Sequence, residues 1–436
     1  MTIAEDLGKI RKNLTKKQVK VLYVCPFAHH PGHPPWAALN EPAALEEAGS
    51  DVKLVTFCGV IDNTKAKVPE IVVVPAKYGL AHRFFSLLRK QTPTRWVLML
   101  FETASTIAKA ISIKHRQGFD IIYLRDGEPF LFMSHLLSLP FKDINWVVSL
   151  TAANIYLPKM PKLEFRTLPL IIYILVLRFV VNSSVWGLLY RMSLRRNNFR
   201  FVTQNREAER DYSQYLGGVF GNRVQYLPIG VRRLNHNIQV SKREARRILG
   251  LPQRKPIFLS FGAPHSGKDY DVVFSVLQGM RDVYFVHAGR QAFSLGSHPQ
   301  LLAEKYGMED RVVVKDYYIP EEEKLYYFVA ADAVIISYTR EFLSTTSVLW
   351  EACRFGTPVI ASDNGQLKEL MEAFQPGLLF RAQDTDSLKE AIIRFINLKP
   401  EEIERLKENC WRFSDEFSLD KWAQRCLEIY DSLLTR

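Results

Sequence analysis

The most regular feature of the chain is a series of short apolar runs that alternate with amphipathic stretches of helical period. The first run, VKVLYVCPF at residues 19–27, is apolar almost throughout, which is typical of a strand buried on both faces of a parallel sheet. Amphipathic stretches such as 96–116 lie between several of these runs. The other runs of the first half lie at 51–57, 70–76, 119–125, 144–150, 199–205 and 223–231. This alternation predicts an α/β domain with a doubly wound sheet.

The same pattern restarts after a polar and basic stretch at 232–256, which we interpret as the connection into a second domain. The apolar runs of the second half lie at 256–262, 283–289, 311–317, 332–338, 357–362 and 377–380. We therefore predict two Rossmann-like domains, over residues 1–235 and 236–410, that face a cleft where the carboxyl ends of their strands bind ligands. An amphipathic pattern at 418–436 predicts a terminal helix.

Composition narrows the class of protein less than the pattern does. The 436 residues carry a formal net charge of +12, with a pI near 9.3, which favours an anionic partner such as nucleic acid, an acidic membrane surface or a phosphorylated small molecule. No recognition motif accompanies the charge, so we expect no nucleic-acid partner. The five cysteines show no CxxC or metal-ligand spacing, which predicts reduced thiols and no metal site. The charged N-terminal stretch lacks the apolar core of a signal peptide, and we expect a cytoplasmic protein.

One apolar segment stands apart from this alternation. Residues 168–190 begin with about ten apolar positions but then contain Arg178, and they fall short of the roughly 18 uninterrupted apolar residues of a spanning helix. Arg191 and Arg195 follow at once. An apolar helix beside a basic cluster predicts peripheral contact with the cytoplasmic face of a membrane through residues 168–200. The alternative is a buried core helix with a basic solvent edge.

The stretch FLSTTSVLWEACRFGTPVIASDNG at 342–365 carries the first candidate chemistry. Four hydroxyl residues precede an apolar run that contains one acid, Glu351. The four are Ser344, Thr345, Thr346 and Ser347. Hydroxyl side chains cap helix N-termini, and such an end suits a phosphate or diphosphate. Counted from Ser344, Glu351 returns to nearly the same helix face, where its carboxylate would accept from vicinal ribose hydroxyls. A solvated helix acid is the alternative.

The loop SFGAPHSGKDY at 260–270 is the second candidate. Gly262 and Gly267 permit a tight turn and close backbone approach, and Lys268 supplies a positive charge. An ordinary strand-to-helix turn would have the same composition. If the sheet is doubly wound, this loop and the hydroxyl-rich helix start face the same cleft.

Together these segments resemble the retaining GT-B glycosyltransferases of group 1, the family 4-like enzymes. The resemblance covers nearly the whole chain and is strongest from 256 to 380. LWEACRFGTPVIASDNGQLKEL resembles the family's Glu-Ala helix, Gly-x-Pro-Val strand and glycine turn. LPIGV at 227–231 resembles the end of the N-terminal domain, while VYFVHAG and YYFVAADAVIIS stand in the family's order before the signature.

The resemblance implies a nucleotide-diphosphate sugar bound mainly by the C-terminal domain, a saccharide acceptor bound by the N-terminal domain, and no metal or other cofactor. It implies that Lys268 contacts the diphosphate, that Glu351 holds the ribose, and that the backbone around Gly262 and around 344–347 contacts phosphates. It also implies that the terminal helix, taken as 411–436, packs back on the N-terminal domain.

Three positions depart from the family's pattern. Leu343 stands where a second glutamate is common, Ala263 where an arginine is common, and Thr151 where a histidine is common. With the arginine missing, we expect Lys268 to carry more of the diphosphate charge.

Candidates for acceptor chemistry come from the first half of the chain. His33 lies in a loop rich in histidine and proline where the resemblance places the acceptor, and it would orient a hydroxyl or act as a base; ordinary loop polarity is the alternative. Asp126, in YLRDGEP, follows an expected strand. The catalytic candidates are therefore Lys268, His33 and Asp126.

The expected function is that of a hexosyltransferase that moves a sugar from a nucleotide-diphosphate donor to a membrane- or lipid-linked saccharide with retention, as in polysaccharide biosynthesis. Two alternatives remain open. One is an inverting GT-B enzyme. The other is a non-catalytic subunit that binds nucleotide sugar or lipid and supports a partner transferase, which the departures at Leu343 and Ala263 favour.

Overall fold

The computed structural model describes residues 18–28, 33–57, 70–74, 92–125, 143–150, 197–215, 223–234, 238–265, 267–291, 298–340, 342 and 345–435. These residues form two compact units. The first contains the described residues up to 203, those of 208–227 and those from 423 onward; the second contains 204–207 and the described part of 228–422. The apolar segment 168–190 lies outside the described residues.

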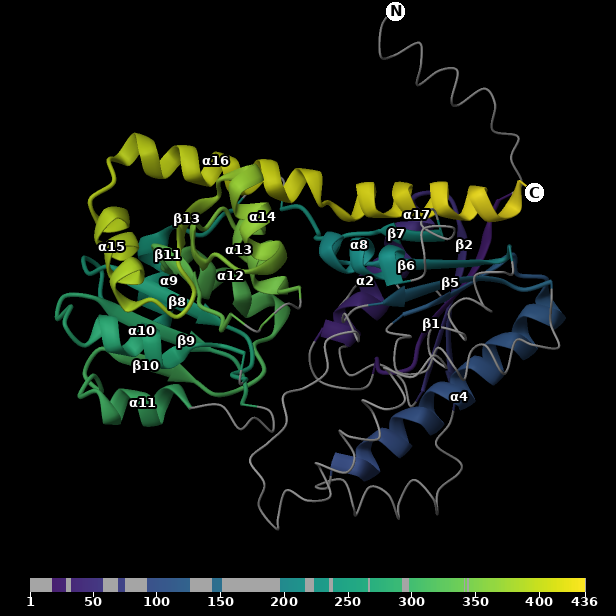
Figure 1. Cartoon of the computed structure of the whole chain (residues 1–436), viewed down its shortest axis with the longest axis horizontal. Helices are drawn as coiled ribbons and strands as arrows, with labels where there is room; N and C mark the ends of the chain where they lie inside the picture. The colour runs from purple at the N-terminus through teal and green to yellow at the C-terminus, as the bar shows by residue number, and fades with distance from the viewer. Residues whose placement is uncertain are drawn as a thin grey trace, which may run out of the picture. The chain divides into compact units, whose positions relative to one another are not determined.

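The first unit is built on a parallel sheet (Figure 1). Among its described residues seven strands lie in the order β3-β2-β1-β4-β5-β6-β7, and each falls within the apolar run that predicts it. The strands are β1 (Lys20–Cys25), β2 (Asp51–Phe57), β3 (Glu70–Val74), β4 (Ile121–Leu124), β5 (Asn145–Leu150), β6 (Phe199–Thr203) and β7 (Val224–Tyr226). Because β1 pairs with β2 on one side and with β4 on the other, the topological switch point lies between β1 and β4.

Helices and a buried ion pair complete the first unit. Among its described residues, the helices are α2 (His33–Glu47), α4 (Thr92–Gln117), the part of α8 (Arg206–Tyr215) from 208 onward and the part of α17 (Leu419–Leu434) from 423 onward. Both α2 and α4 contact β1 and β2. Within the core, Arg125 lies 3.4 Å from the Glu41 carboxylate, and both side chains are almost fully buried. The Tyr23 hydroxyl also donates to Glu41, so this buried charge is paired and hydrogen-bonded, as burial demands.

The second unit repeats the same logic. Six strands of its described residues form a parallel sheet in the order β10-β9-β8-β11-β12-β13. They are β8 (Ile257–Phe261), β9 (Tyr284–Ala288), β10 (Val312–Lys315), β11 (Ala333–Ile336), β12 (Val359–Ser362) and β13 (Gly377–Phe380). The sheet grows from β8 through β9 to β10 and then resumes at β11 on the other side of β8. The expected doubly wound fold is therefore confirmed, with its switch point between β8 and β11.

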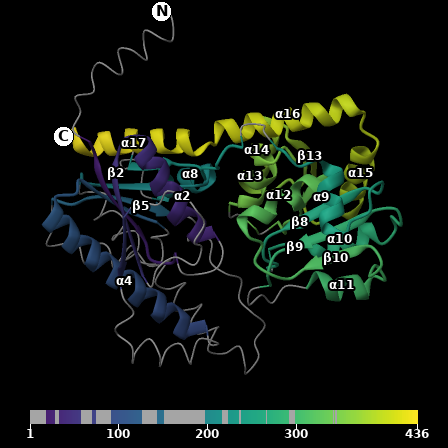
Figure 2. The ribbon, with the colours of Figure 1, turned by 180° about the vertical axis from the view of Figure 1, so that it is seen from behind.

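Both faces of this second sheet are covered. Successive side chains of a strand point to opposite faces, so Leu259 of β8 belongs to a core with α9, α12, α13 and α16, whereas Phe258 belongs to a core with α10, α11 and α15. Helix α16 lies along α13 and α14 in both views of the ribbon (Figure 1 and Figure 2). The helices are α9 (Lys242–Leu249), α10 (Tyr270–Leu277), α11 (Pro299–Lys305), α12 (Glu321–Ala330), α13 (Ser347–Arg354), α14 (Gly365–Phe374), α15 (Thr385–Ile396) and α16 (Pro400–Glu416).

The terminal helix that the amphipathic pattern predicts at 418–436 is confirmed as α17. Helix α16 ends at Glu416, so the stretch taken as 411–436 contains the end of one helix and the whole of the next. The break has a physical cause. The Val231 N–H donates to the Phe417 carbonyl at 2.8 Å, and the Leu419 N–H donates to the Val231 carbonyl at 3.0 Å. These bonds engage backbone groups that a continuous helix would pair within itself. The residues of α17 from 423 onward are counted with the first unit.

Three further features bear on function. Among the described residues, each unit has two buried cysteines, Cys25 and Cys426 in the first and Cys353 and Cys410 in the second. Over the same residues, no cluster of histidine, cysteine, aspartate or glutamate is arranged to hold a metal ion. None of the helices in the described ranges combines the length and the hydropathy needed to cross a bilayer.

Candidate functional site

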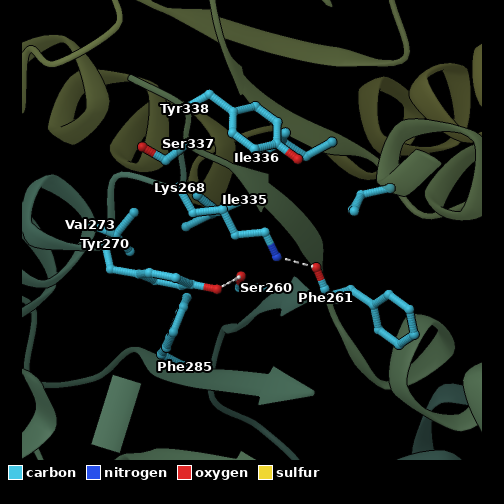
Figure 3. A pocket seen from close by; sticks show the side chains of 11 residues that line it. Ser260, Phe261, Lys268, Tyr270, Val273, Phe285, Ile335, Ile336, Ser337 and Tyr338 are labelled. Atoms are coloured by element: carbon cyan, nitrogen blue, oxygen red, sulfur yellow. Dashed lines mark hydrogen bonds between the residues drawn. The ribbon is translucent and has the colours of Figure 1, made fainter. Parts of the chain in front are cut away.

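A pocket opens at the switch point of the second sheet, at the carboxyl ends of β8 and β11 (Figure 3). This is the edge at which open α/β sheets bind ligands. Its polar lining comes from the exits of the two strands, from the glycine-containing loop and from the start of α10. The lining residues used below are Ser260, Phe261, Lys268, Tyr270, Ser337 and Tyr338.

Lys268 is held in place by backbone pairing on both sides. The Asp269 N–H donates to the Ser337 carbonyl, and the Thr339 N–H donates to the Gly267 carbonyl, each at 2.9 Å. Lys268 therefore lies in a short antiparallel bridge between the glycine loop and the exit of β11. Such pairing fixes the backbone of a loop that would otherwise be free to move.

The ammonium group of Lys268 bonds to two carbonyl groups at the end of β8. Its Nζ lies 2.6 Å from the Phe261 oxygen, the bond drawn in Figure 3, and 3.1 Å from the Gly262 oxygen. Burial away from water lowers the pKa of Lys268 to about 7. No carboxylate in the described part of the chain lies within ion-pair distance of it. The pocket thus contains a cation whose counter-charge the described residues do not supply.

A buried hydrogen-bonded chain supports the glycine loop from below. His287 Nε2 lies 3.2 Å from the Gly289 carbonyl, which can only accept, so Nε2 carries the proton and Nδ1 accepts. The Tyr270 hydroxyl, 3.3 Å from Nδ1, is then the donor, and it accepts in turn from Ser260 at 3.2 Å. Burial and the charge of Lys268 lower the pKa of His287 to about 3, which agrees with a neutral imidazole in this chain.

Gly289 also has a steric role beside this loop. A Cβ built on Gly289 would lie 2.5 Å from the carbonyl carbon of Gly262. The Gly262 N–H donates to the Ala288 carbonyl at 2.9 Å. The exits of β8 and β9 therefore touch backbone to backbone, which only glycine allows.

The hydroxyl-rich stretch caps α13, but the helix begins later than expected. It starts at Ser347, and Thr346 is its N-cap. The helix therefore does not start at Ser344, which lies outside the described residues. The expectation that Ser344 and Glu351 lie on one face of this helix is wrong as well. The cause is the Thr346 hydroxyl, which accepts from the Val348 N–H at 3.3 Å and from the Tyr338 hydroxyl at 2.7 Å. These bonds hold Thr346 in an extended conformation at the helix start.

A second pocket adjoins the first through Tyr338, which lines both. Thr345, Thr346 and Trp350 also line it, and the Thr345 hydroxyl donates to Gln366 at 2.9 Å. The Trp350 indole nitrogen is buried and has no hydrogen-bond partner among the described residues.

Glu351 lies outside both pockets. Its carboxylate is turned toward α12, where Oε1 accepts from the Lys324 ammonium at 2.8 Å. Oε2 accepts from Arg354, one turn further along α13, at 3.3 Å. The Glu351 side chain is 13% exposed.

The structure brings some of the sequence candidates together and leaves others apart. The Lys268 ammonium bonds to the Gly262 carbonyl. Thr345 and Thr346 line the adjoining pocket, and Ser347 begins α13. Asp126 lies outside the described residues. His33 is the first residue of α2, so the expectation that it lies in the preceding loop is wrong. The catalytic roles of Lys268, His33 and Asp126 stay predictions.

Sequence reasoning missed the polar residues that follow or back the strands. Ser337 and Tyr338 end the run that predicts β11, and His287 lies inside the run that predicts β9. Apolar periodicity placed these residues in strands. It does not indicate which polar residues of a strand have a functional role. The signal was available for Ser337 and Tyr338, because polar residues directly after a buried parallel strand lie at the ligand-binding edge.

Known proteins that resemble this chain include glycosyltransferases and proteins with a similar two-sheet fold. Residues 241–411 match the family described as Glycosyl transferases group 1. Sucrose-phosphate synthase from Thermosynechococcus elongatus has a similar fold, with a TM-score of 0.66 and 16% identity over 96% of this chain and 100% of that one. HepE from Anabaena, in a structure with UDP and glucose, gives a TM-score of 0.64 and 16% identity over 95% of this chain and 100% of that one.

A curated relative by sequence is the trehalose-6-phosphate synthase of Mycolicibacterium smegmatis, 28% identical over 113 residues. That match spans 25% of this chain and 22% of the relative. The two sheets and the structural likenesses define a GT-B fold, as expected from the sequence. Within it, the second unit carries a group 1 glycosyltransferase domain over residues 241–411.

Proposed function

We propose that the chain transfers a sugar from a nucleotide-diphosphate donor to a saccharide acceptor, with retention of the anomeric configuration. The observation that carries the proposal is Lys268, a cation held at the ligand-binding edge of the second sheet without a carboxylate partner among the described residues. A diphosphate is the anion that a group 1 domain would bring there. The structure of HepE in complex with UDP and glucose supports a nucleotide-sugar donor.

Lys268 has a donor to spare for a phosphate oxygen. An ammonium group carries three N–H donors, and the Phe261 and Gly262 carbonyls accept two of them. The third would bond to the diphosphate as the glycosidic bond to it breaks and negative charge grows on the leaving oxygen. A fixed cation aimed at developing charge stabilises the transition state more than the ground state. The start of α13, with its partial positive charge, acts in the same sense.

The acceptor side of the proposal rests on the sequence. The segment 168–200 combines an apolar stretch with several arginines, which favours a membrane- or lipid-linked saccharide and peripheral attachment to the cytoplasmic face of a membrane. His33 and Asp126 are the candidates for orienting the acceptor hydroxyl. Retention follows from the resemblance to group 1 enzymes.

A thermal-shift screen of nucleotide sugars on the purified chain tests the donor. We expect one of them to raise the melting temperature, and Lys268→Met to reduce that shift. Lys305→Met is the matched control, because Lys305, the last residue of α11, forms an exposed ion pair with Asp271 of α10 and its replacement should leave the shift unchanged. If no nucleotide sugar stabilises the wild-type chain, the proposal fails.

Turnover separates the enzyme from the alternatives. Transfer or slow donor hydrolysis by the purified chain would exclude a non-catalytic subunit, and the anomeric configuration of the product, read by NMR, would distinguish retention from inversion. Donor binding without any turnover would favour the non-catalytic subunit.

A further inference from the structure

Four charged side chains between α12 and α13 form a closed ring. Lys324 Nζ lies 2.8 Å from Glu351 and 2.7 Å from Glu321. Arg354 lies 3.3 Å from Glu351 and also pairs with Glu321. Two acids and two bases thus alternate, and each carboxylate has both oxygens engaged by a different cation. Although burial disfavours the charged ammonium, Glu351 and Glu321 hold the pKa of Lys324 above its usual range.

The ring lies near the ligand-binding edge of the second sheet. In a parallel α/β sheet the helix after each strand starts at the carboxyl edge and runs back toward the amino edge. Helix α12 starts at Glu321, and Lys324 lies within its first turn. Helix α13 starts at Ser347, and Glu351 lies just over one turn along it. Lys324 and Glu351 are therefore at similar depth, about one turn below the edge where the nucleotide would bind.

The ring leaves Glu351 able to accept further hydrogen bonds. An ionised carboxylate offers about four lone-pair positions, and Lys324 and Arg354 occupy one on each oxygen. The remaining pair of positions, with the side chain still 13% exposed, matches two neighbouring hydroxyl groups. The ring also cancels the charge of Glu351, which would otherwise repel a diphosphate bound close by.

We propose that Lys324 and Arg354 are positioning residues that hold the Glu351 carboxylate, oriented and charge-compensated, to bind the two ribose hydroxyls of the nucleotide donor. This inference rests on the proposed function. It gives Lys324 and Arg354 a role in distinguishing ribose from deoxyribose. A purely structural link between α12 and α13 would have no such effect.

The test compares ribonucleotides with their 2′-deoxy counterparts on the full-length chain. Isothermal titration calorimetry measures the Kd of UDP, GDP and ADP and of the matching 2′-deoxynucleoside diphosphates. Hydrogen bonds to a charged acceptor predict a ribose preference of about tenfold to 100-fold for the base that binds best. In Lys324→Met and in Glu351→Gln this preference should fall to about twofold or less. The deoxy form, which keeps its 3′-hydroxyl, should weaken by a smaller factor than the ribo form.

Matched variants keep the outcome clear. Lys324→Arg retains the cation and should restore most of the preference, and Lys305→Met, a lysine with an exposed carboxylate partner, should leave it intact. The double variant Lys324→Met/Glu351→Gln should lose no more preference than either single one, because both act through one carboxylate. Should Lys324→Met fail to fold, Arg354→Lys is measured in its place and should lower the preference, since lysine cannot reproduce the guanidinium geometry.

The failures of the two proposals differ. If no nucleoside diphosphate binds to the wild-type chain, the proposed function fails. If the wild-type chain binds one of them without a ribose preference, or if Lys324→Met weakens the ribo and deoxy forms equally or keeps the preference, the positioning role is overturned while the donor site stands.

Discussion

Lys268 makes donor binding sensitive to pH in a way that can be worked out from its surroundings. Burial lowers its pKa to about 7 in the free protein, whereas a bound diphosphate favours the charged form and raises the pKa again. A donor therefore binds at full strength below about pH 7 and loses affinity as the pH rises through that value. The loss follows the protonated fraction of Lys268, and it amounts to about 30-fold between pH 6 and pH 8.5, or about 2 kcal/mol.

The described histidines and tyrosines beside Lys268 keep their charge constant between pH 6 and pH 8.5. Burial and the Lys268 charge lower the pKa of His265 to about 4 and that of His287 to about 3, so both imidazoles are neutral above pH 6. Burial raises the pKa of Tyr270, and that of Tyr338 to about 12, so both phenols stay protonated. The diphosphate of an intact nucleotide sugar is a diester that remains ionised throughout, which makes it a better probe than a nucleoside diphosphate.

Calorimetry of the intact donor across this pH range is the assay, with titrations in buffers of different ionisation enthalpy to count the protons taken up. Lys268→Met should bind more weakly by about tenfold to 100-fold at pH 6 and show no pH dependence. Lys268→Arg, which stays charged, should bind equally at pH 6 and pH 8.5. A wild-type Kd that is the same at both pH values, together with weak binding by Lys268→Met, would refute the reasoning from burial, because the ammonium would then be charged at all times.

Three further substitutions test the packing around the site and the core of the first unit, each by urea denaturation. Gly289→Ala should lower the free energy of unfolding by about 2 kcal/mol or more, since its Cβ would lie 2.5 Å from backbone atoms. Gly307→Ala, in open space at φ +61°, should lower it by only about 1 kcal/mol. Equal losses in the two variants would contradict the steric clash at Gly289. Thr346→Ala should cost about 1–2 kcal/mol by removing the cap of α13, with Thr346→Ser close to wild type. Arg125→Met should cost about 3–5 kcal/mol because it removes the cation of a buried ion pair. A loss below about 1 kcal/mol would mean that the pair contributes little to stability.

The fold could be read from the sequence because parallel strands buried on both faces leave an unambiguous apolar signature. Residues 51–57 and 377–380 predict β2 and β13 to the residue. Helix ends were harder, since they depend on distant partners. The start of α13 is set by Thr346 and its bond to Tyr338, and the break before α17 by the bridge to Val231. Neither contact is local enough for periodicity to detect.

The candidate site was only partly predictable for a similar reason. Lys268 could be singled out because a lysine in a glycine loop after a strand is a recognisable pattern. The ion pairs of Glu351 could not be predicted from the sequence, because Lys324 comes from another helix and only the fold brings the two side chains together. The buried chain from Ser260 to the Gly289 carbonyl likewise joins residues of three elements. Assigning such roles needs coordinates.

The buried cysteines give each unit a built-in reporter of its opening. Because Cys25 and Cys426 lie in the core of one unit and Cys353 and Cys410 in that of the other, an alkylating reagent reaches each pair only when its own unit opens. Peptide mapping after timed exposure to iodoacetamide would give two separate labelling rates from a single sample. A donor that tightens only the second unit should slow labelling of Cys353 and Cys410 and leave the other pair unprotected.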